Sequence, residues 1–187
     1  MQSIVERLSS LARISTEAQQ RLAEMLMPSA PKKGTILLKE GTVCQHMYFM
    51  TQGFARAYFY KNGRDITSWF AQDNDILTPL DSFVGQRPSY ENVELLEDSL
   101  LYSLRYKDLQ LLYRQYPEAN AIGRILTEKY YVELMERTMA FQFQTASERY
   151  HDLERRQPKL LQRASLGHIA SFLGISQETL SRIRTKA

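Results

Sequence analysis

The sequence predicts an α+β protein in which helical segments flank a closed or double-layered antiparallel β domain. Apolar residues recur at helical spacing in the first 26 residues and again from Lys107 onward. Between these two regions the sequence changes to short aromatic and β-branched runs that turn residues separate. Short strands at this spacing are typical of an antiparallel domain that closes on itself or packs as two layers.

The N-terminal region is expected to hold two helices, over residues 3–12 and 16–26. Leucines recur on one face of each segment at helical spacing. Pro28 and Pro31 close this region, because proline lacks a backbone N–H and does not continue a helix.

Six short runs in the middle of the chain are predicted to be strands. Asn62-Gly63 lies between two of them and is a strong hairpin signal, because both residues tolerate a positive φ. The predicted strands are 35–38, 46–51, 54–60, 65–70, 90–96 and 99–105.

Helical spacing returns after the last strand. Residues 107–116 predict a short amphipathic helix that Pro117 ends, and residues 118–146 then hold no proline and Gly123 as their one glycine. A helix this long that is apolar on more than one side needs cover on both sides. We expect one face to pack on the β domain and the other on the same helix of a second copy. The residues predicted to form this dimer helix are Ile122, Leu126, Tyr130 and Leu134, which fall four apart.

The last segment of the chain, HIASFLGISQETLSRIRTKA, predicts two short helices joined by a turn. Gly174 suits the left-handed residue that ends the first helix, and Ser176 is a good N-cap for the second. Apolar residues on the two helices, such as Leu173 and Leu180, can then meet across the turn. This is the pattern of a helix-turn-helix, whose second helix enters the major groove of DNA.

The second of these helices carries polar side chains with base-reading chemistry. Glutamine can bond adenine, glutamate can accept from cytosine, and arginine can bond guanine twice. The predicted base contacts are Gln177, Glu178, Ser181 and Arg182, and the predicted phosphate contacts are Ser165, Ser176, Thr179, Arg184 and Lys186. The alternative is an ordinary helical hairpin with a solvated polar face.

The positive charge of the chain is concentrated at its C-terminal end. Residues 146–187 carry a net charge of +4, whereas residues 1–145 sum to −1. A polyanion such as DNA is therefore expected to dock at this end, although a solvated basic tail would show the same balance.

Composition and cysteine content narrow the class of protein. Hydrophobic residues make up 43% of the chain and charged residues 24%, which is ordinary for a globular domain. The sequence has no apolar run long enough for a transmembrane helix, and its N-terminus lacks the compact apolar core of a signal peptide. Cys44 is the single cysteine, which excludes an internal disulfide and a cysteine-held iron–sulfur cluster. A cytoplasmic location is therefore expected.

The order of these parts resembles the catabolite activator protein and anaerobic regulator family of bacterial transcription factors. The most specific match is IASFLGISQETLSRIR, in which Gln177, Glu178 and Arg182 fall on the family's base-reading positions in the pattern x-E-T-x-x-R. The segments NDILTPL and SYENVELLEDSLLYSL, followed by YKDLQLLYRQYP, resemble the nucleotide-pocket region and the helix after it. The resemblance implies an antiparallel β-roll, a cupin-like double-stranded β-helix, with flanking helices, a long dimerisation helix and a C-terminal helix-turn-helix.

The effector pocket departs from the pattern of the family's cyclic-nucleotide binders. Those proteins carry G-E-L, whose Glu holds the ribose, and later R-[ST]-A, whose Arg pairs with the cyclic phosphate. Here the first motif reads Thr78-Pro79-Leu80, and the Arg position falls on Ser89 unless a shorter loop lets Arg87 replace it. A buried phosphate without a cation is costly, so we expect an effector other than cyclic AMP. The predicted pocket residues are Thr78, Leu80, Arg87, Ser89 and Tyr90.

Three domains are predicted from these features. Residues 1–116 hold the N-terminal helices and a cyclic-nucleotide-binding-like β-roll, residues 117–146 the dimerisation helix, and residues 147–187 the helix-turn-helix DNA-binding domain. A DNA-binding unit this small buries little surface by itself, so we expect it to lean on its own long helix or on the partner subunit.

The predicted function is that of a sequence-specific transcriptional regulator that binds double-stranded DNA as a homodimer. RNA polymerase and an unknown small-molecule effector are further expected partners, with no membrane, cofactor or metal. The alternative is a sensor of cyclic nucleotides or other small ligands whose DNA binding is weak or lost. An enzyme is not expected, because His46, His151 and His168 lie in separate segments and no nucleophile–base or metal constellation can be assembled.

Overall fold

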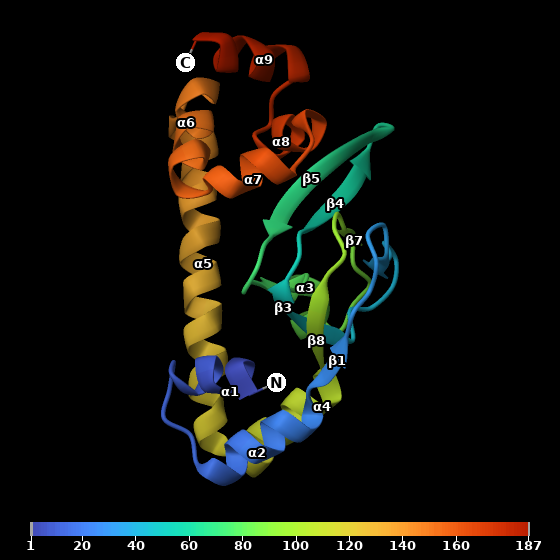
Figure 1. Ribbon diagram of the computed structural model, residues 1–187, viewed down its shortest axis with the longest axis vertical. Coiled ribbons are helices and arrows are strands. Elements are labelled where there is room, and N and C mark those ends of the chain that lie inside the picture. Colours follow the sequence, from blue (N-terminus) through green and yellow to red (C-terminus); the bar gives the residue numbers. More distant parts are fainter. Residues whose placement is uncertain (1, 187) are drawn as a thin grey trace.

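Two antiparallel four-stranded sheets form the centre of the molecule, and helices cover their ends and one side (Figure 1). The computed structural model describes residues 2–186, with side chains for residues 4–185. One sheet has the strand order β1-β8-β3-β6 and the other β2-β7-β4-β5. We call this pair of sheets the β-roll. The predicted α+β class, with antiparallel sheets and flanking helices, is confirmed.

All six predicted strands are present, and two further short strands complete the sheets. β1 contains Pro28 and pairs only with β8, which fits the confinement of proline to sheet edges. β6 has only two residues, too few to give an alternating pattern. The strands are β1 (Met27–Ser29), β2 (Ile36–Leu38), β3 (His46–Gln52), β4 (Ala55–Lys61), β5 (Arg64–Ala71), β6 (Ile76–Leu77), β7 (Asn92–Leu95) and β8 (Leu100–Arg105).

The hairpin between β4 and β5 turns at Asn62 and Gly63, as predicted. Their φ angles are 53° and 74°, the left-handed conformation that a tight two-residue hairpin requires. The two strands on either side of this turn pair from Lys61 with Arg64 to Ala55 with Ala71. The hairpin extends β4 and β5 beyond the other strands, toward the C-terminal helices (Figure 1).

Two hydrophobic cores stabilise the lower and middle parts of the molecule. Between the two sheets the core includes Met50, Leu95 and Leu101 together with Phe83 of α3 (Leu80–Gly85). Below the sheets a second core joins α1 (Gln2–Ser9), α2 (Thr16–Met25), α4 (Tyr106–Gln115), the short 3-10 helix η1 (Pro117–Ala119) and the first turn of α5 (Asn120–Phe143). The helices predicted before the strands and directly after them are therefore present.

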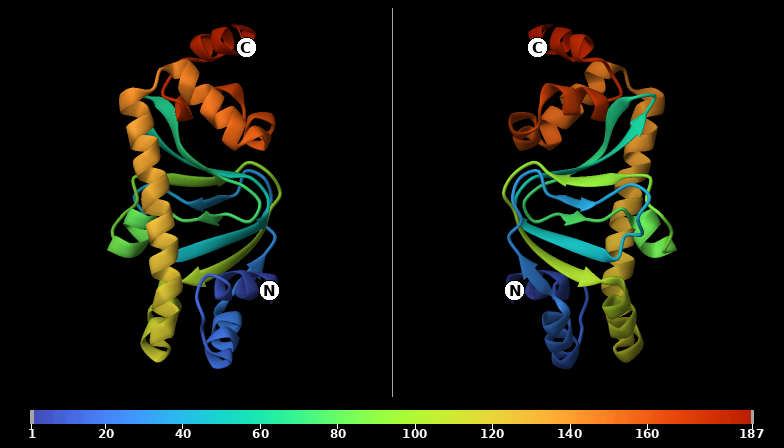
Figure 2. Two further views of the ribbon diagram at one scale, coloured as in Figure 1. Left: turned by 90° about the vertical axis from the view of Figure 1, so that its left-hand side faces the viewer. Right: turned by 90° about the vertical axis from the view of Figure 1, so that its right-hand side faces the viewer.

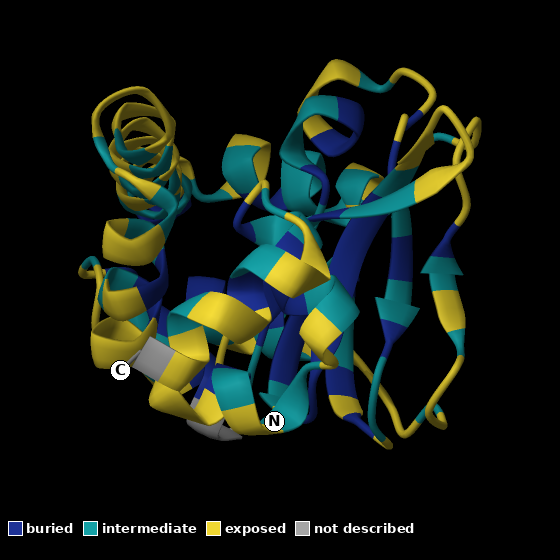
Figure 3. Cartoon of the chain, turned by 90° about the horizontal axis from the view of Figure 1, so that it is seen from above, coloured by how far each residue is buried: buried dark blue, intermediate teal, exposed yellow. Residues whose placement is uncertain are grey.

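Helix α5 is 24 residues long and runs along the side of the molecule from the N-terminal helices to the C-terminal ones (Figures 1 and 2). Ile122 is the one buried residue of this helix. Viewed along the molecule, most turns of α5 are exposed or half-buried (Figure 3). No helix in the described part of the chain is long and apolar enough to cross a membrane.

The inner face of α5 carries most of the residues predicted for the dimer seam. Ile122 is buried and Leu126 packs on the same lower core, while the Tyr130 ring lies 5.7 Å from the Trp69 ring of β5. Of the four residues predicted for the dimer helix, only Leu134 is exposed, at 41%. Four-residue spacing alone does not identify which side of a helix faces its own domain, and here the β-roll takes the predicted side.

Four short helices follow α5 and cover the upper end of the β-roll (Figure 2). We call them the C-terminal unit: α6 (Ala146–Arg156), α7 (Pro158–Arg163), α8 (Leu166–Phe172) and α9 (Gln177–Lys186). Thr145 begins α6 with a capping box, in which its hydroxyl and the Glu148 carboxylate each accept a backbone N–H of the other residue.

Candidate nucleic-acid interface and ligand cavity

The turn between α8 and α9 is built by Gly174 and Ser176. Gly174 has a φ of 68°, and a Cβ at this position would lie 2.9 Å from a ring carbon of Phe141. Both the backbone conformation and the space therefore favour glycine. The Ser176 hydroxyl accepts the Thr179 N–H at 3.2 Å and begins α9, and Ser165 begins α8 in the same way through His168 N–H.

The facing sides of α8 and α9 share one apolar core. Leu180 is fully buried, and Ile169, Ala170 and Leu173 are each at most 4% exposed. The Gln177 side chain of α9 reaches α8 at Gly167, where a Cβ would lie 2.8 Å from its side-chain amide nitrogen, Nε2. This packing fixes which side of α9 faces solvent.

The four predicted base-contact residues lie on that solvent side. Gln177, Glu178, Ser181 and Arg182 are all exposed, and their spacing of one and four residues places them on adjoining turns. The Ser176 hydroxyl, as a hydrogen-bond partner, lowers the pKa of the Glu178 carboxyl, which therefore stays an acceptor at neutral pH.

The predicted phosphate contacts surround this face but are less uniform. Ser165, Ser176 and Arg184 are exposed, while Thr179 is half-buried with its hydroxyl 3.2 Å from the Ser176 hydroxyl. The side chain of Lys186 lies outside the described part of the structure.

Several cations of the C-terminal unit are occupied by internal ion pairs. Arg163 pairs with Glu97 and Asp73 of the β-roll region, and Arg156 with Glu136 of α5. Arg182 and Arg184 form no ion pair with the side chains that the structure describes. The excess charge read from the sequence is therefore partly neutralised by ion pairs within the molecule, while Arg182 and Arg184 of α9 remain exposed.

The C-terminal unit docks on the β-roll through α8, and this contact was not predicted. The Ser171 hydroxyl accepts the Thr67 N–H of β5 at 3.1 Å, and the Phe172 and Phe70 rings meet edge to face with centroids 5.2 Å apart. Phe54 and Phe70 belong to the same core as the residues between α8 and α9. Support for this unit was expected from α5 or from a partner subunit. The aromatic residues on β5 are the sequence feature that could have indicated its contact with the β-roll.

His168 lies at this docked surface rather than beside the exposed residues of α9. Its Nδ1 atom is buried and has no hydrogen-bond partner among the described residues. Burial and the nearby Arg56 guanidinium lower the pKa of the imidazole, so it is held neutral. This placement favours a structural role for His168.

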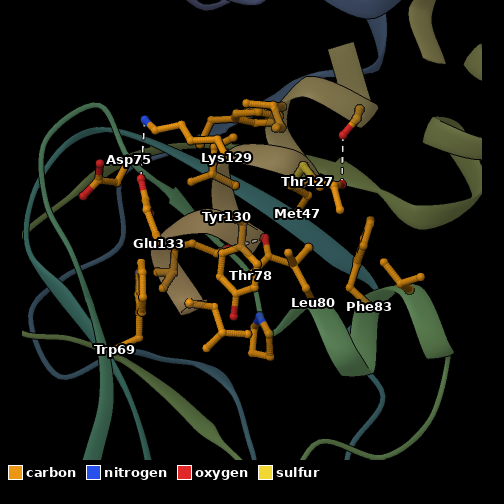
Figure 4. A pocket seen from close by; sticks show the side chains of 18 of the residues that line it. Met47, Trp69, Asp75, Thr78, Leu80, Phe83, Thr127, Lys129, Tyr130 and Glu133 are labelled. Carbon is orange, nitrogen blue, oxygen red and sulfur yellow. Dashed lines mark hydrogen bonds and ion pairs between the residues drawn. The ribbon is translucent and has the colours of Figure 1, made fainter. Parts of the chain in front are cut away.

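A cavity of about 1450 Å³ separates the inner face of α5 from the β-roll. Thr78, from the loop before α3, and Leu80, the first residue of α3, line this cavity, as do Trp69 and Tyr130 (Figure 4). Tyr90 also lines the cavity. Three of the five predicted effector residues are thus brought together at one site.

Ser89 and Arg87 do not line the cavity. The Ser89 side chain is buried, and its hydroxyl donates to the Glu91 carbonyl and accepts the Glu91 N–H, both at 3.0 Å. Arg87 is 70% exposed, with its guanidinium 4.0 Å from the Asp81 carboxylate. Neither of the residues considered for the phosphate-binding position therefore offers a donor to a ligand in this cavity.

Other polar groups in the cavity wall were missed by the sequence analysis. Arg137 projects from α5 and donates hydrogen bonds to the backbone carbonyls of Ser68 and Phe172. Glu91 is 9% exposed, and burial raises the pKa of its carboxyl. No group of three metal-binding side chains occurs among the described residues. No motif marks Arg137 or Glu91, because their shared position depends on how α5 crosses the β-roll.

The β-roll, with the cavity between it and α5, has the architecture of a cyclic nucleotide-binding domain. Residues 31–116 match the family model of the cyclic nucleotide-binding domain. No curated protein sequence matches the chain.

Solved structures share nearly the whole fold. A Crp/Fnr-family transcriptional regulator from Eubacterium rectale superposes with a TM-score of 0.73 and 17% identity, over 92% of this chain and 83% of that one. The c-di-GMP responsive global regulator of Xanthomonas campestris gives 0.69 and 17%, over 92% and 91%. The Thermus thermophilus catabolite activator protein gives 0.58 and 17%, over 93% and 84%. The resemblance to the catabolite activator and anaerobic regulator family is confirmed.

Proposed function

We propose that this protein is a sequence-specific transcriptional regulator that binds double-stranded DNA as a homodimer in the bacterial cytoplasm. The observation that carries the proposal is the α9 surface, where Gln177, Glu178, Ser181 and Arg182 are exposed together. A helix held by an apolar core on one side and carrying base-reading side chains on the other is suited to the major groove. The fold that it shares with known regulators supports this reading.

The outer face of α5 is the proposed dimer surface. Its apolar residues Val132, Met135 and Met139 are spaced by three and four, as in a coiled-coil seam. They are exposed by 53%, 37% and 46%. Tyr131 beside them is 60% exposed. A second copy of α5 would remove this apolar surface from water.

The geometry of a two-fold dimer predicts the form of the DNA site. Two copies of α9 would enter successive major grooves, so the site should be an inverted repeat with half-site centres roughly 34 Å apart. Arg182 should give the sharpest preference, for guanine, because its guanidinium can bond two acceptors on that base.

Selection of bound DNA from a random pool, followed by affinity measurement, tests the proposal. Arg182→Ala should cost about 1–3 kcal/mol on the selected site and relax one symmetric pair of positions. Lys186→Ala should weaken all sequences alike and flatten the salt dependence, as expected of a phosphate contact. Arg155→Ala is a matched control, because Arg155 pairs with Asp152 in α6. An unchanged selected sequence in Arg182→Ala would refute this placement, and no binding by the wild type would favour a sensor without DNA binding.

The effector and polymerase contacts complete the proposal. Cyclic AMP is not the expected effector, because Pro79 lacks an N–H, the Ser89 hydroxyl is bonded to the Glu91 backbone, and neither Ser89 nor Arg87 lines the cavity. RNA polymerase is the expected protein partner of a regulator bound beside a promoter. Calorimetry with cyclic AMP at micromolar concentration should show no binding heat.

A further inference from the structure

The Arg137 guanidinium is a largely enclosed cation without a counterion. It contacts the Ser68 carbonyl, the Phe172 carbonyl at 3.5 Å and the Phe172 ring at 4.3 Å. No described carboxylate oxygen lies within the 4.0 Å of an ion pair; the partners of the guanidinium are the two carbonyls, the Phe172 ring and, at 5.6 Å, the Phe141 ring. An arginine has five N–H donors, and a buried charge is costly unless it is paired.

The surrounding charges do not supply a counterion for Arg137. Burial lowers the pKa of Arg137, whereas the hydrogen bond from Arg163 to Glu97 raises the pKa of Arg163. Glu91 is the acid whose charge most favours the Arg137 cation, but it lies too far away for an ion pair, and burial raises the pKa of the Glu91 carboxyl. The wall of the cavity therefore presents a cation that an incoming anion would satisfy.

Two aromatic side chains line the same cavity as this cation. The rings of Trp69 and Tyr130 are 5.7 Å apart and inclined by 51°, and both line the cavity (Figure 4). Tyr130 and Arg137 are two helical turns apart on α5, a span of roughly 10 Å. This matches a ligand with a flat ring system at one end and a charged group at the other. The cavity exceeds the usual range for small ligands, about 300–1,000 Å³, so a fused ring system fits.

We propose that the cavity between α5 and the β-roll binds an aromatic carboxylate, with the carboxylate on Arg137 and the ring against Trp69 and Tyr130. The proposal deepens the proposed function and rests on it for the role of the ligand as an effector. It places the anion-binding residue on the long helix, not on the loop that carries Arg87 and Ser89. A planar carboxylate suits a single guanidinium, which can donate two parallel hydrogen bonds to it.

Trp69 provides a direct readout, because it is the one tryptophan in the chain and lies in the cavity wall. The probes are 2-naphthoate and its neutral amide, 2-naphthamide, titrated without DNA while Trp69 emission is recorded. The carboxylate should bind at least about ten-fold more tightly than the amide, because a hydrogen bond to a charged group contributes more than one between neutral groups. Arg137→Gln should reduce that ratio to about two-fold or less, and Arg137→Lys should leave an intermediate ratio.

Arg114→Gln is the matched control, because Arg114 is exposed on α4 and does not line the cavity; it should keep the wild-type ratio. Equal affinities of the two probes for the wild type would overturn the proposal, whether or not Arg137→Gln folds, which circular dichroism would establish. An undiminished ratio in folded Arg137→Gln, or tighter binding of cyclic AMP than of 2-naphthoate, would overturn it as well. Because no DNA is present, failure of DNA binding leaves this result unaffected.

Discussion

The ion pair between Arg163 and Glu97 offers a quantitative test of how the C-terminal unit is held on the β-roll. Arg163 donates to both Glu97 oxygens, at 2.9 and 2.6 Å, and to Asp73 at 3.2 Å. Its guanidinium carbon also lies 4.9 Å from the centre of the Phe54 ring. Replacing it by methionine in Arg163→Met keeps much of the apolar stem and removes the charge.

The expected magnitude follows from the exposure of the partners. Arg163 is 19% exposed, whereas the Glu97 and Asp73 side chains are 41% and 43% exposed. Breaking a buried pair costs about 3–5 kcal/mol and an exposed pair about 0–1 kcal/mol, so we expect a coupling of about 1–2 kcal/mol between Arg163 and Glu97. Loss of the contact with Phe54 adds about 0.5–1 kcal/mol to the cost of Arg163→Met.

A double-mutant cycle measures this coupling. Urea unfolding of Arg163→Met, Glu97→Gln and the double variant gives the interaction free energy, and hydrogen exchange locates the change. Exchange of the α8 amides should rise in Arg163→Met and stay near the wild-type rate in Arg155→Met, whose ion pair with Asp152 lies within α6. A coupling below about 0.3 kcal/mol would refute the reasoning, since that is within the error of additivity.

Three further predictions follow from other parts of the structure. Met135→Glu, on the outer face of α5, should convert a dimer into a monomer in light scattering, whereas Lys107→Glu on α4 should not; a dimeric Met135→Glu would contradict the proposed seam. Hydrogen bonding from Arg163 lowers the pKa of Glu97, so the stability that this pair adds is present above the unfolded value of about 4.3 and is lost as the pH falls through the folded value. Urea midpoints at pH 7 and pH 3.5 should therefore differ less in Glu97→Gln than in the wild type. Burial raises the pKa of Cys44 to about 11, so iodoacetamide should alkylate it slowly at pH 8 in the folded protein and rapidly in urea; equal rates would show that the thiol is accessible.

Local signals in the sequence were sufficient where the structure depends on a few neighbouring residues. The left-handed conformations of Asn62 and Gly63 and of Gly174 follow from the small steric cost at those positions. The Ser176 cap follows from the hydroxyl that it offers to the first turn of α9. Each of these features is determined within about four residues of chain, which is why the hairpin and both C-terminal helices could be predicted.

The orientation of α5 could not be predicted in the same way. Apolar residues occur around the helix, so both the set from Ile122 to Leu134 and the set from Val132 to Met139 have acceptable spacing. Contact with Trp69 decides between them, because the Tyr130 ring packs against it and turns its own side of the helix inward. That contact joins residues 61 positions apart in the chain, and no local pattern specifies it.

The proposed effector site could also be predicted only in part from the sequence. Thr78 and Leu80 were found because they stand at the family's G-E-L position, and the start of α3 after β6 places them at the cavity. Arg137 was not found because an arginine on a helix ordinarily has its charge in solvent. Its enclosure results from the way that α8 docks on β5, which brings the Phe172 ring to within 4.3 Å of the guanidinium.

Arg137 therefore connects three parts of the molecule that the function would need to couple. It lines the cavity, it bonds the Ser68 carbonyl of β5, and it contacts Phe172 of the helix that supports α9. An anion that bound Arg137 would compete with the carbonyl and ring contacts that now hold α8 against the β-roll. It would thereby shift the position of α9 relative to the outer seam of α5, and hence the spacing of two recognition helices in a dimer. Such coupling is reciprocal: a ligand that changes the affinity for DNA by some factor must itself be bound more or less tightly by that same factor when DNA is present.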